Sequence, residues 1–152
     1  GGGSAGGHVA AATAVAKGFD EEGEDTSVSC RPDALVLFNP VFDNSPGGYG
    51  HGRVKKYWKD FSPLHNLDKN TPPTVVFLGT KDKLIPVAIA KDYQKRMKDN
   101  GVRCELFLYE GQPHGFFNKA RYYETLLEAD KFLTSLGYLK GEPTLKKPKA
   151  KK

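Results

Sequence analysis

The sequence lacks any hydrophobic run near the roughly 20 apolar residues that a membrane-spanning helix requires. It is also poor in cysteine, because Cys30 and Cys104 are the only two and stand far apart. Neither belongs to a CxxC or a Cys/His pattern, so neither a zinc site nor a redox pair is expected. We therefore predict no membrane span and no metal, and we expect Cys104, which opens an apolar run, to pack as a small hydrophobe.

Most of the chain has no excess of positive or negative residues, although the formal net charge is +5. Five of the 23 basic residues lie in the last seven positions, which leaves 18 basic residues against 18 acidic ones. We predict a disordered, lysine-rich tail over residues 140–152 and a nearly neutral body that needs no nucleic-acid partner. A tail that binds an anionic partner is the open alternative. The five lysines are Lys146, Lys147, Lys149, Lys151 and Lys152.

The body of the chain alternates short apolar runs with helical patterns. Each apolar run is continuous and closed by a turn signal, as expected for a strand buried on both faces. Strands that alternate with helices predict an α/β fold, here a parallel sheet of about three strands flanked by helices, over a domain of residues 1–139. The expected strands are 34–40, 74–80 and 104–110, and the expected helices are 6–17, 84–101 and 119–136.

The chain begins GGGSAGGHVAAA, with no initiator methionine and no strand before the first expected helix. A Gly/Ser linker is one interpretation of this start. The other is a strand-turn-helix unit whose strand has been left off, because a sheet of three apolar parallel strands needs neighbours on both sides. On the second interpretation, the N-terminal strands of the fold are missing.

The opening glycines surround a serine in the pattern G-x-S-x-G, which spans residues 2–6. In this pattern the serine occupies a strained turn between strand and helix, and the glycines on either side avoid collisions between side chains. The helix N-terminus and the Ala5 N–H would stabilise an oxyanion there. The sequence therefore predicts Ser4 as a nucleophile and Ala5 as an oxyanion-hole residue, although the pattern alone is weak.

Two further residues follow expected strands. Asp82 comes directly after the strand 74–80, and His114 comes after the strand 104–110. Parallel strands place such loops at the same edge of the sheet, so the order Ser, Asp, His predicts a catalytic triad of Ser4, Asp82 and His114. Taken singly, Asp82 would be a turn or helix-capping aspartate and His114 a loop histidine without a role.

Other candidates at this edge are weaker. Asp43 is the runner-up for the acid, although it follows a different strand from Asp82. His8 lies one helical turn beyond Ser4 and is expected to pack or to support the site from behind. His51 and His65 have no partner at metal-ligand spacing.

Residues 41–73 are rich in glycine and proline and show no clean period, which is typical of a functional or mobile segment. We predict that it is a lid or cap insertion whose aromatic side chains line a substrate pocket. Simple packing of these rings onto the sheet is the alternative. The candidate pocket residues are Tyr49, Tyr57, Trp58, Phe61 and, outside the segment, Phe116.

The stretches GGSAGGHVAA, FLGTKDKLIPV and YEGQPHGFFN together resemble the α/β-hydrolase superfamily, in particular bacterial acetyl esterases, lipase-like enzymes and feruloyl or acetylxylan esterases. The resemblance covers about residues 1–137. It implies the C-terminal half of such a fold, with Ser4 as nucleophile, His114 as general base and acid, and Asp82 as the orienting acid. It also implies an upstream HGG loop that completes the oxyanion hole, and no cofactor.

The leading hypothesis is a serine carboxylesterase that acts on small acyl or carbohydrate esters, and we expect the isolated chain to be inactive or nearly so. A serine peptidase of the prolyl oligopeptidase type and a non-catalytic hydrolase-like binding module remain as alternatives. The sequence gives neither the compartment nor the oligomeric state, although the resemblance leans toward a secreted or periplasmic protein.

Overall fold

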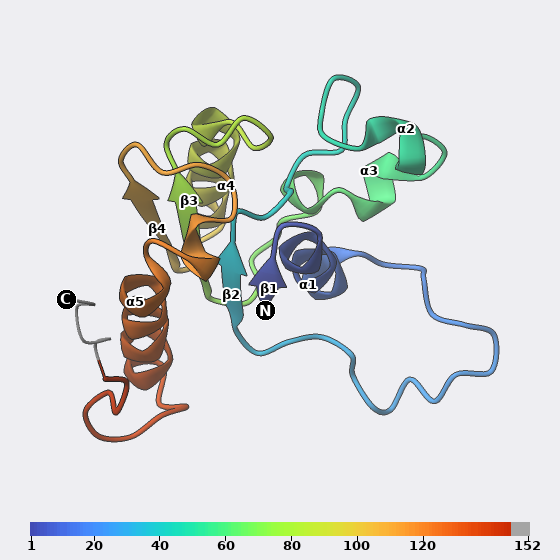
Figure 1. Cartoon of the computed structure of the whole chain (residues 1–152). Coiled ribbons are helices and arrows are strands. Elements are labelled where there is room, and N and C mark those ends of the chain that lie inside the picture. Colours follow the sequence, from blue (N-terminus) through green and yellow to red (C-terminus); the bar gives the residue numbers. More distant parts are fainter. Residues whose placement is uncertain (147–152) are drawn as a thin grey trace.

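The computed structural model describes residues 1–146, which form a four-stranded sheet with the order β1-β2-β3-β4 and every neighbouring pair parallel (Figure 1). The α/β class and the parallel sheet are confirmed. The sheet has one strand more than the three expected, because Gly2 and Gly3 form a short strand where only a turn was predicted. The strands are β1 (Gly2–Gly3), β2 (Leu35–Phe38), β3 (Thr74–Gly79) and β4 (Cys104–Tyr109).

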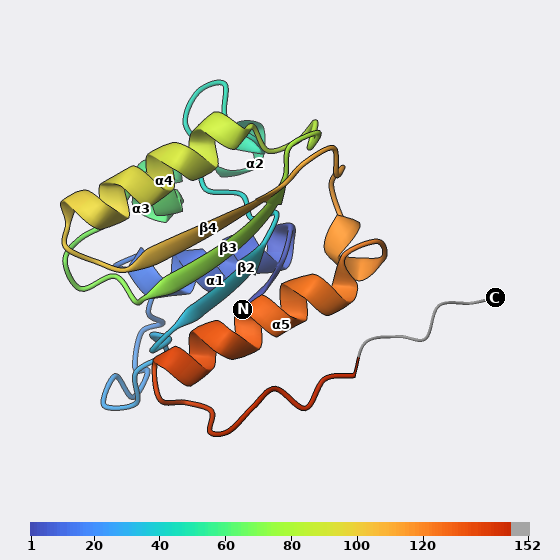
Figure 2. The ribbon, with the colours of Figure 1, turned by 90° about the vertical axis from the view of Figure 1, so that its left-hand side faces the viewer.

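Helices cover both faces of the sheet. On one face, α1 (Ala5–Val15) and α4 (Val87–Asp99) pack against the sheet, and α5 (Tyr122–Ser135) covers the other face. Figure 2 shows α4 and α5 on opposite sides of the strands. The result is a three-layer α/β/α arrangement, the usual way to bury a parallel sheet.

Strand β3 contributes to the hydrophobic cores on both faces of the sheet, because all six of its residues are buried. Val76 faces the α1 and α4 side, where it packs with Leu37 and Met97, whereas Phe77 faces α5 and packs with Phe132. Cys104 packs at the edge of the first core, as expected, and its burial raises the pKa of its thiol to about 12.

Glycines end two of the three long helices. Gly101 after α4 and Gly137 after α5 both adopt positive φ, and the next residue returns an N–H to a helical carbonyl. The helix α1 differs, because it ends at Val15, before Gly18, with an extended Ala16. The start of α5 also differs from the expected 119, since a 3₁₀ turn (Phe116–Asn118) comes first.

The segment 41–73 contains more regular structure than its sequence predicts. It forms two four-residue helices, α2 (His51–Val54) and α3 (Trp58–Phe61), and a 3₁₀ turn (Pro63–His65). It lies toward the carboxyl ends of the strands, beside α1 (Figure 1), where the rings of Phe61 and His8 are 4.8 Å apart. Its role as a lid stays a prediction.

The predicted tail falls only partly within the described residues. Residues 140–146 form no helix or strand, and residues 147–152 lie outside the described part. Within residues 1–146, none of the helices is both long and apolar enough for a membrane span.

Candidate active site

Ser4 stands on the turn between β1 and α1 in a strained backbone conformation. Its φ of 52° and ψ of −116° lie outside the regions that residues with a side chain normally occupy. The Ser4 N–H continues the β1–β2 ladder by donating to the Phe38 carbonyl at 2.8 Å, and the Ser4 carbonyl accepts the His8 N–H at 3.0 Å. The strand and the helix therefore hold the strained residue from both sides.

Close backbone packing explains two of the glycines around Ser4. A Cβ on Gly2 would lie 2.7 Å from the Gly6 carbonyl carbon, and a Cβ on Gly7 would lie 2.9 Å from the Gly2 oxygen and 3.1 Å from Pro40. A Cβ on Gly6 would meet no atom within 4 Å. The steric argument for the second glycine of the motif is therefore wrong in this chain, because the helix turns its crowded side to Gly7.

The structure brings Ser4, His114 and Asp82 into one hydrogen-bonded row. His114 Nε2 lies 2.9 Å from Ser4 Oγ, and His114 Nδ1 lies 2.7 Å from Asp82 Oδ2. The Asp82 carboxylate is an acceptor, so Nδ1 carries the proton and donates it, which leaves the Nε2 lone pair for the serine hydroxyl. In this tautomer the imidazole can take a proton from Ser4 Oγ.

Asp82 is fixed by four donors, and its side chain is 0% exposed. Its Oδ1 accepts the backbone N–H groups of Leu84 at 2.8 Å and Ile85 at 3.0 Å, which form a turn at the start of the segment leading to α4. Its Oδ2 accepts from His114 and also from the Asn39 side-chain amide at 2.9 Å. The carboxylate can therefore neither rotate nor reach water.

The loops after β3 and β4 are joined to each other. Thr80 Oγ1 accepts the Gly111 N–H at 2.8 Å, and the Lys81 N–H donates to the Gln112 carbonyl at 3.0 Å. Because the register pairs Gly79 with Tyr109, both loops leave the sheet at the same level. This pairing sets the distance between Asp82 and His114.

Asn39 is the residue of the site that sequence reasoning missed. It follows β2, is fully buried and adopts a φ of 44°. The available signal was the Asn-Pro pair that closes the apolar run 34–40, which we interpreted only as a turn. A polar residue at the carboxyl end of a central strand also indicates a functional site, because active groups of α/β sheets lie at that edge.

The Ala5 N–H is the first of α1 and therefore has no acceptor within the helix. It follows the serine directly, at the positive end of the helix dipole. The Ala5 N–H is therefore free to donate a hydrogen bond to a negatively charged oxygen beside Ser4 Oγ.

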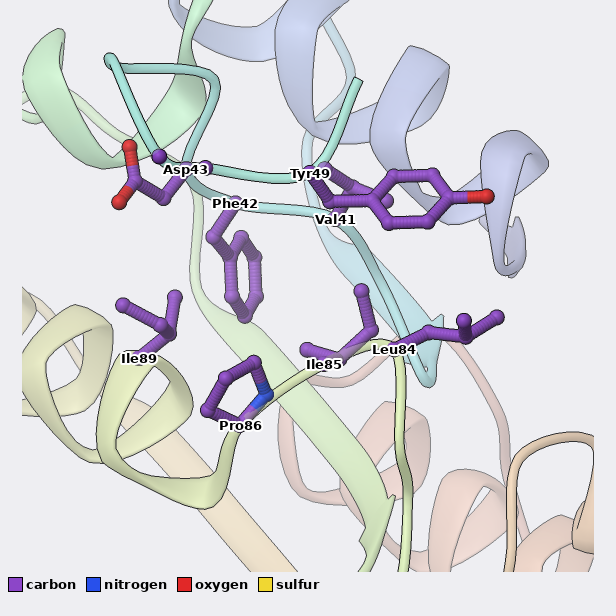
Figure 3. Close-up of a pocket in the computed structure, with 10 residues that line it drawn as sticks. Val41, Phe42, Asp43, Tyr49, Leu84, Ile85, Pro86 and Ile89 are labelled. Atoms are coloured by element: carbon purple, nitrogen blue, oxygen red, sulfur yellow. The ribbon is translucent and has the colours of Figure 1, made fainter. Parts of the chain in front are cut away.

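A cavity of about 230 Å³ lies between the loop after β2 and the start of α4. Figure 3 shows Phe42 facing Pro86 and Ile85 across it, with Ile89 at its side. Leu84 and Ile85 line the cavity and also donate the N–H groups that bind Asp82, so the cavity adjoins the acid loop. Its lining is mostly apolar.

Of the five candidate pocket residues, Tyr49 lines this cavity. Tyr57 and Phe61 pack edge-on against Phe19, on the α1 side. Trp58 lies between the rings of His51 and His65, at centroid distances of 6.2 Å and 5.1 Å. Phe116 is 2% exposed and belongs to the core beneath α5.

The remaining candidates lie apart from the row. The Asp43 carboxylate accepts the Ser45 N–H at 2.8 Å and comes within 4.0 Å of His65, and His114 bonds to Asp82 instead. Burial lowers the pKa of His8, and the nearby Asn44 side chain opposes that shift in part. In the described part of the chain, no three His, Cys, Asp or Glu side chains are grouped so that they could hold a metal ion.

The chain is an α/β-hydrolase by its fold and by its similarity to solved esterases. The signature of the Dienelactone hydrolase family matches residues 39–140, so the chain belongs to this family. The match includes Asp82 and His114 but not Ser4.

Esterase 2 of Thermogutta terrifontis has a similar structure. Its apo form shows a TM-score of 0.85 and 37% identity, over 93% of this chain and 56% of that one. The same esterase has been solved phosphorylated by paraoxon and with propionate or butyrate bound, each with a TM-score of 0.82.

Two plant proteins are similar in sequence. A probable isoprenylcysteine alpha-carbonyl methylesterase of Arabidopsis thaliana is 30% identical over 73% of this chain and 28% of its own length. An acylamino-acid-releasing enzyme of the same plant is 29% identical over 43% of this chain and 9% of its own length. The chain thus spans just over half of the bacterial esterase and less of the plant relatives.

Proposed function

We propose that this chain carries the nucleophile, acid and base of a serine carboxylesterase. The observation that carries the proposal is the continuous row from Ser4 Oγ through His114 to Asp82, with hydrogen bonds of 2.9 Å and 2.7 Å. The esterases among the similar proteins support the same reaction class.

The proposed mechanism follows from the hydrogen bonds. His114 Nε2 removes the proton of Ser4 Oγ as this oxygen attacks the ester carbonyl, and Asp82 stabilises the resulting imidazolium. The Ala5 N–H donates to the oxyanion, and the resemblance implies that an upstream loop supplies a second donor. The alcohol leaves with the proton from His114. His114 then takes a proton from water as the water oxygen attacks the acyl-enzyme, and Ser4 regains this proton as the acid is released.

Short acyl esters are the proposed substrates. The apolar cavity beside the Asp82 loop holds about 230 Å³, which suits a small aliphatic group. The propionate and butyrate bound to the similar bacterial esterase agree with this size.

Labelling with paraoxon tests the proposal. In the full-length protein that contains this chain, we expect the Ser4 peptide to gain the mass of a diethylphosphoryl group in place of the hydroxyl proton, with release of p-nitrophenolate. The Ser4→Ala variant should gain none, and Asp82→Asn should be labelled far more slowly, because the imidazole loses its orienting carboxylate. An unlabelled wild-type Ser4, in a protein shown to be folded, would overturn the proposal.

A second candidate, release of acylated amino acids from peptides, is favoured by the match to the acylamino-acid-releasing enzyme. Paraoxon would label Ser4 in either case. Comparing kcat/KM for p-nitrophenyl butyrate with kcat/KM for an acetylated amino acid p-nitroanilide separates the two, since an esterase prefers the first substrate.

The 152-residue chain alone is expected to be inactive or nearly so. Losing one oxyanion donor costs about 10²–10³ in rate. Turnover of p-nitrophenyl acetate by the isolated chain, abolished by Ser4→Ala, would refute this expectation.

A further inference from the structure

Asn39 lies where three catalytic loops meet. It is the first residue after β2, its side chain has no access to solvent, and its N–H continues the ladder by donating to the Phe77 carbonyl at 2.8 Å. Its φ of 44° is the left-handed conformation, which asparagine tolerates better than most residues with a side chain. This backbone turn directs the amide toward the ends of β3 and β4 rather than along β2.

Both ends of the amide are used. Its Nδ2 donates to Asp82 Oδ2 at 2.9 Å, and its Oδ1 accepts the Gly115 N–H at 3.3 Å. The carboxylate can only accept and the Gly115 N–H can only donate, so a flipped amide would lose both bonds. The side chain therefore joins the acid to the residue that follows His114.

Few other residues could replace it. Serine and threonine are too short to bridge both partners, and leucine would remove one donor from the buried Asp82 carboxylate and the acceptor of the part-buried Gly115 N–H. Aspartate has the right shape, but its second oxygen would face Asp82 Oδ2 at about the 2.9 Å of the present bond, and two carboxylates at that distance cannot both be ionised. An amide satisfies both sides at any pH, whereas aspartate does so only while it carries a proton.

We propose that Asn39 is a positioning residue that holds the Asp82 carboxylate and the His114 loop in one fixed arrangement, an inference that rests on the proposed function. By donating to the oxygen that accepts from His114, Asn39 sets the plane of the carboxylate. By accepting from Gly115, it sets the height of the imidazole over Ser4. It touches no reacting atom.

The experiment compares three variants in the full-length protein. Asn39→Gly keeps the positive φ without strain and removes both side-chain bonds. Asn39→Asp keeps the shape and adds a second carboxylate. Thr125→Val is the matched control, because it removes the proton that a buried hydroxyl in α5 donates to the Arg121 and Tyr122 carbonyls, away from the three loops. For each variant, kcat and KM for p-nitrophenyl butyrate, the pH profile of kcat/KM and the Tm are measured.

For Asn39→Gly we expect kcat to fall about 10- to 100-fold with little change in KM, because the triad loses its alignment rather than its binding surface. Paraoxon should label Ser4 more slowly by a similar factor. Thr125→Val should keep the wild-type kcat even if its Tm falls.

For Asn39→Asp we expect kcat/KM to fall as the pH rises above the range in which the two carboxylates share a proton, a step that the wild type lacks. While the proton is shared, the variant side chain can donate to Asp82 as the amide does, whereas two ionised carboxylates repel each other and disturb the position of the acid. Within residues 1–146, His114 is the titratable group bonded to Asp82, and the adjacent Lys81 and Lys83 are exposed. This isosteric variant also decides the matter if Asn39→Gly fails to fold.

An active wild type with a wild-type kcat in Asn39→Gly and a wild-type pH profile in Asn39→Asp would overturn this inference and leave the proposed function standing. A folded wild type that neither hydrolyses the ester nor reacts with paraoxon would overturn the proposed function itself. The two failures are thereby distinguished.

Discussion

Ser4 shows how a single residue can store strain for a reaction. A conformation such as φ 52°, ψ −116° costs about 1–3 kcal/mol and persists only where its surroundings enforce it. Here the enforcement comes from the ladder bond to Phe38 on one side and the first turn of α1 on the other. The proposed nucleophile is consequently aimed at His114 before any substrate arrives.

His8 allows a test of how α1 is held behind Ser4. Burial lowers its pKa, so the folded protein binds a proton on His8 less readily than the unfolded chain does. The free energy of unfolding should therefore decrease as the pH falls through the unfolded value of 6.5 toward the lowered one, and no such loss should occur above that window.

The measurement is the Tm of the wild type and of His8→Gln between neutral and mildly acidic pH. We expect the wild type to lose more stability over this interval than the variant, because glutamine does not titrate. Equal losses in the two proteins would contradict the burial of His8 against Phe61.

Sequence reasoning located Ser4, Asp82 and His114 because each follows a recognisable local pattern at a strand end. The bonds of Asn39 could not be found in the same way, since its partners stand 43 and 76 positions away. The aromatic residues of 41–73 were similarly undetermined, because whether a ring lines a cavity or packs on Phe19 depends on contacts that no local pattern encodes.

At the scale of elements, the ends of β3 and β4 decide the distance between acid and base. Gly79, the last residue of β3, packs directly on the backbone of Gln112, two residues before His114, and an added Cβ would collide with the Gln112 carbonyl. A backbone group cannot move aside as a flexible side chain can. The loop that carries His114 must then shift.

We therefore expect Gly79→Ala to lower kcat/KM for p-nitrophenyl butyrate by about 10²-fold, the usual effect of displacing a catalytic group by about 1 Å. The control is Gly52→Ala in α2, whose added Cβ would meet no atom within 4 Å. Wild-type activity in Gly79→Ala would mean that the loop does not depend on this contact.

The elements themselves were predictable to different degrees. The strands β2, β3 and β4 follow from continuous apolar runs, and the ends of α4 and α5 from glycines. The strand β1 was not predictable, because two glycines carry no side chain whose pattern could be detected, and only pairing with Leu37 and Phe38 defines it. The short helices α2 and α3 depend on packing beside α1 rather than on a period.

At the scale of the whole molecule, the layered fold brings together residues separated by most of the chain. Ser4 and His114 are 110 positions apart, and a parallel sheet places their loops at the same edge. The chain order Ser4, Asp82, His114 is the order expected for an α/β-hydrolase.

The most direct test of the central claim is the kcat/KM for p-nitrophenyl butyrate of three full-length proteins: the wild type, Ser4→Ala and Ser27→Ala. Ser27 lies in the exposed loop between α1 and β2 and serves as the matched control. We predict that Ser4→Ala loses activity by a factor that approaches about 10⁶, whereas Ser27→Ala keeps the wild-type value. Hydrolysis that persists in Ser4→Ala at the wild-type rate would contradict the proposal that Ser4 is the nucleophile.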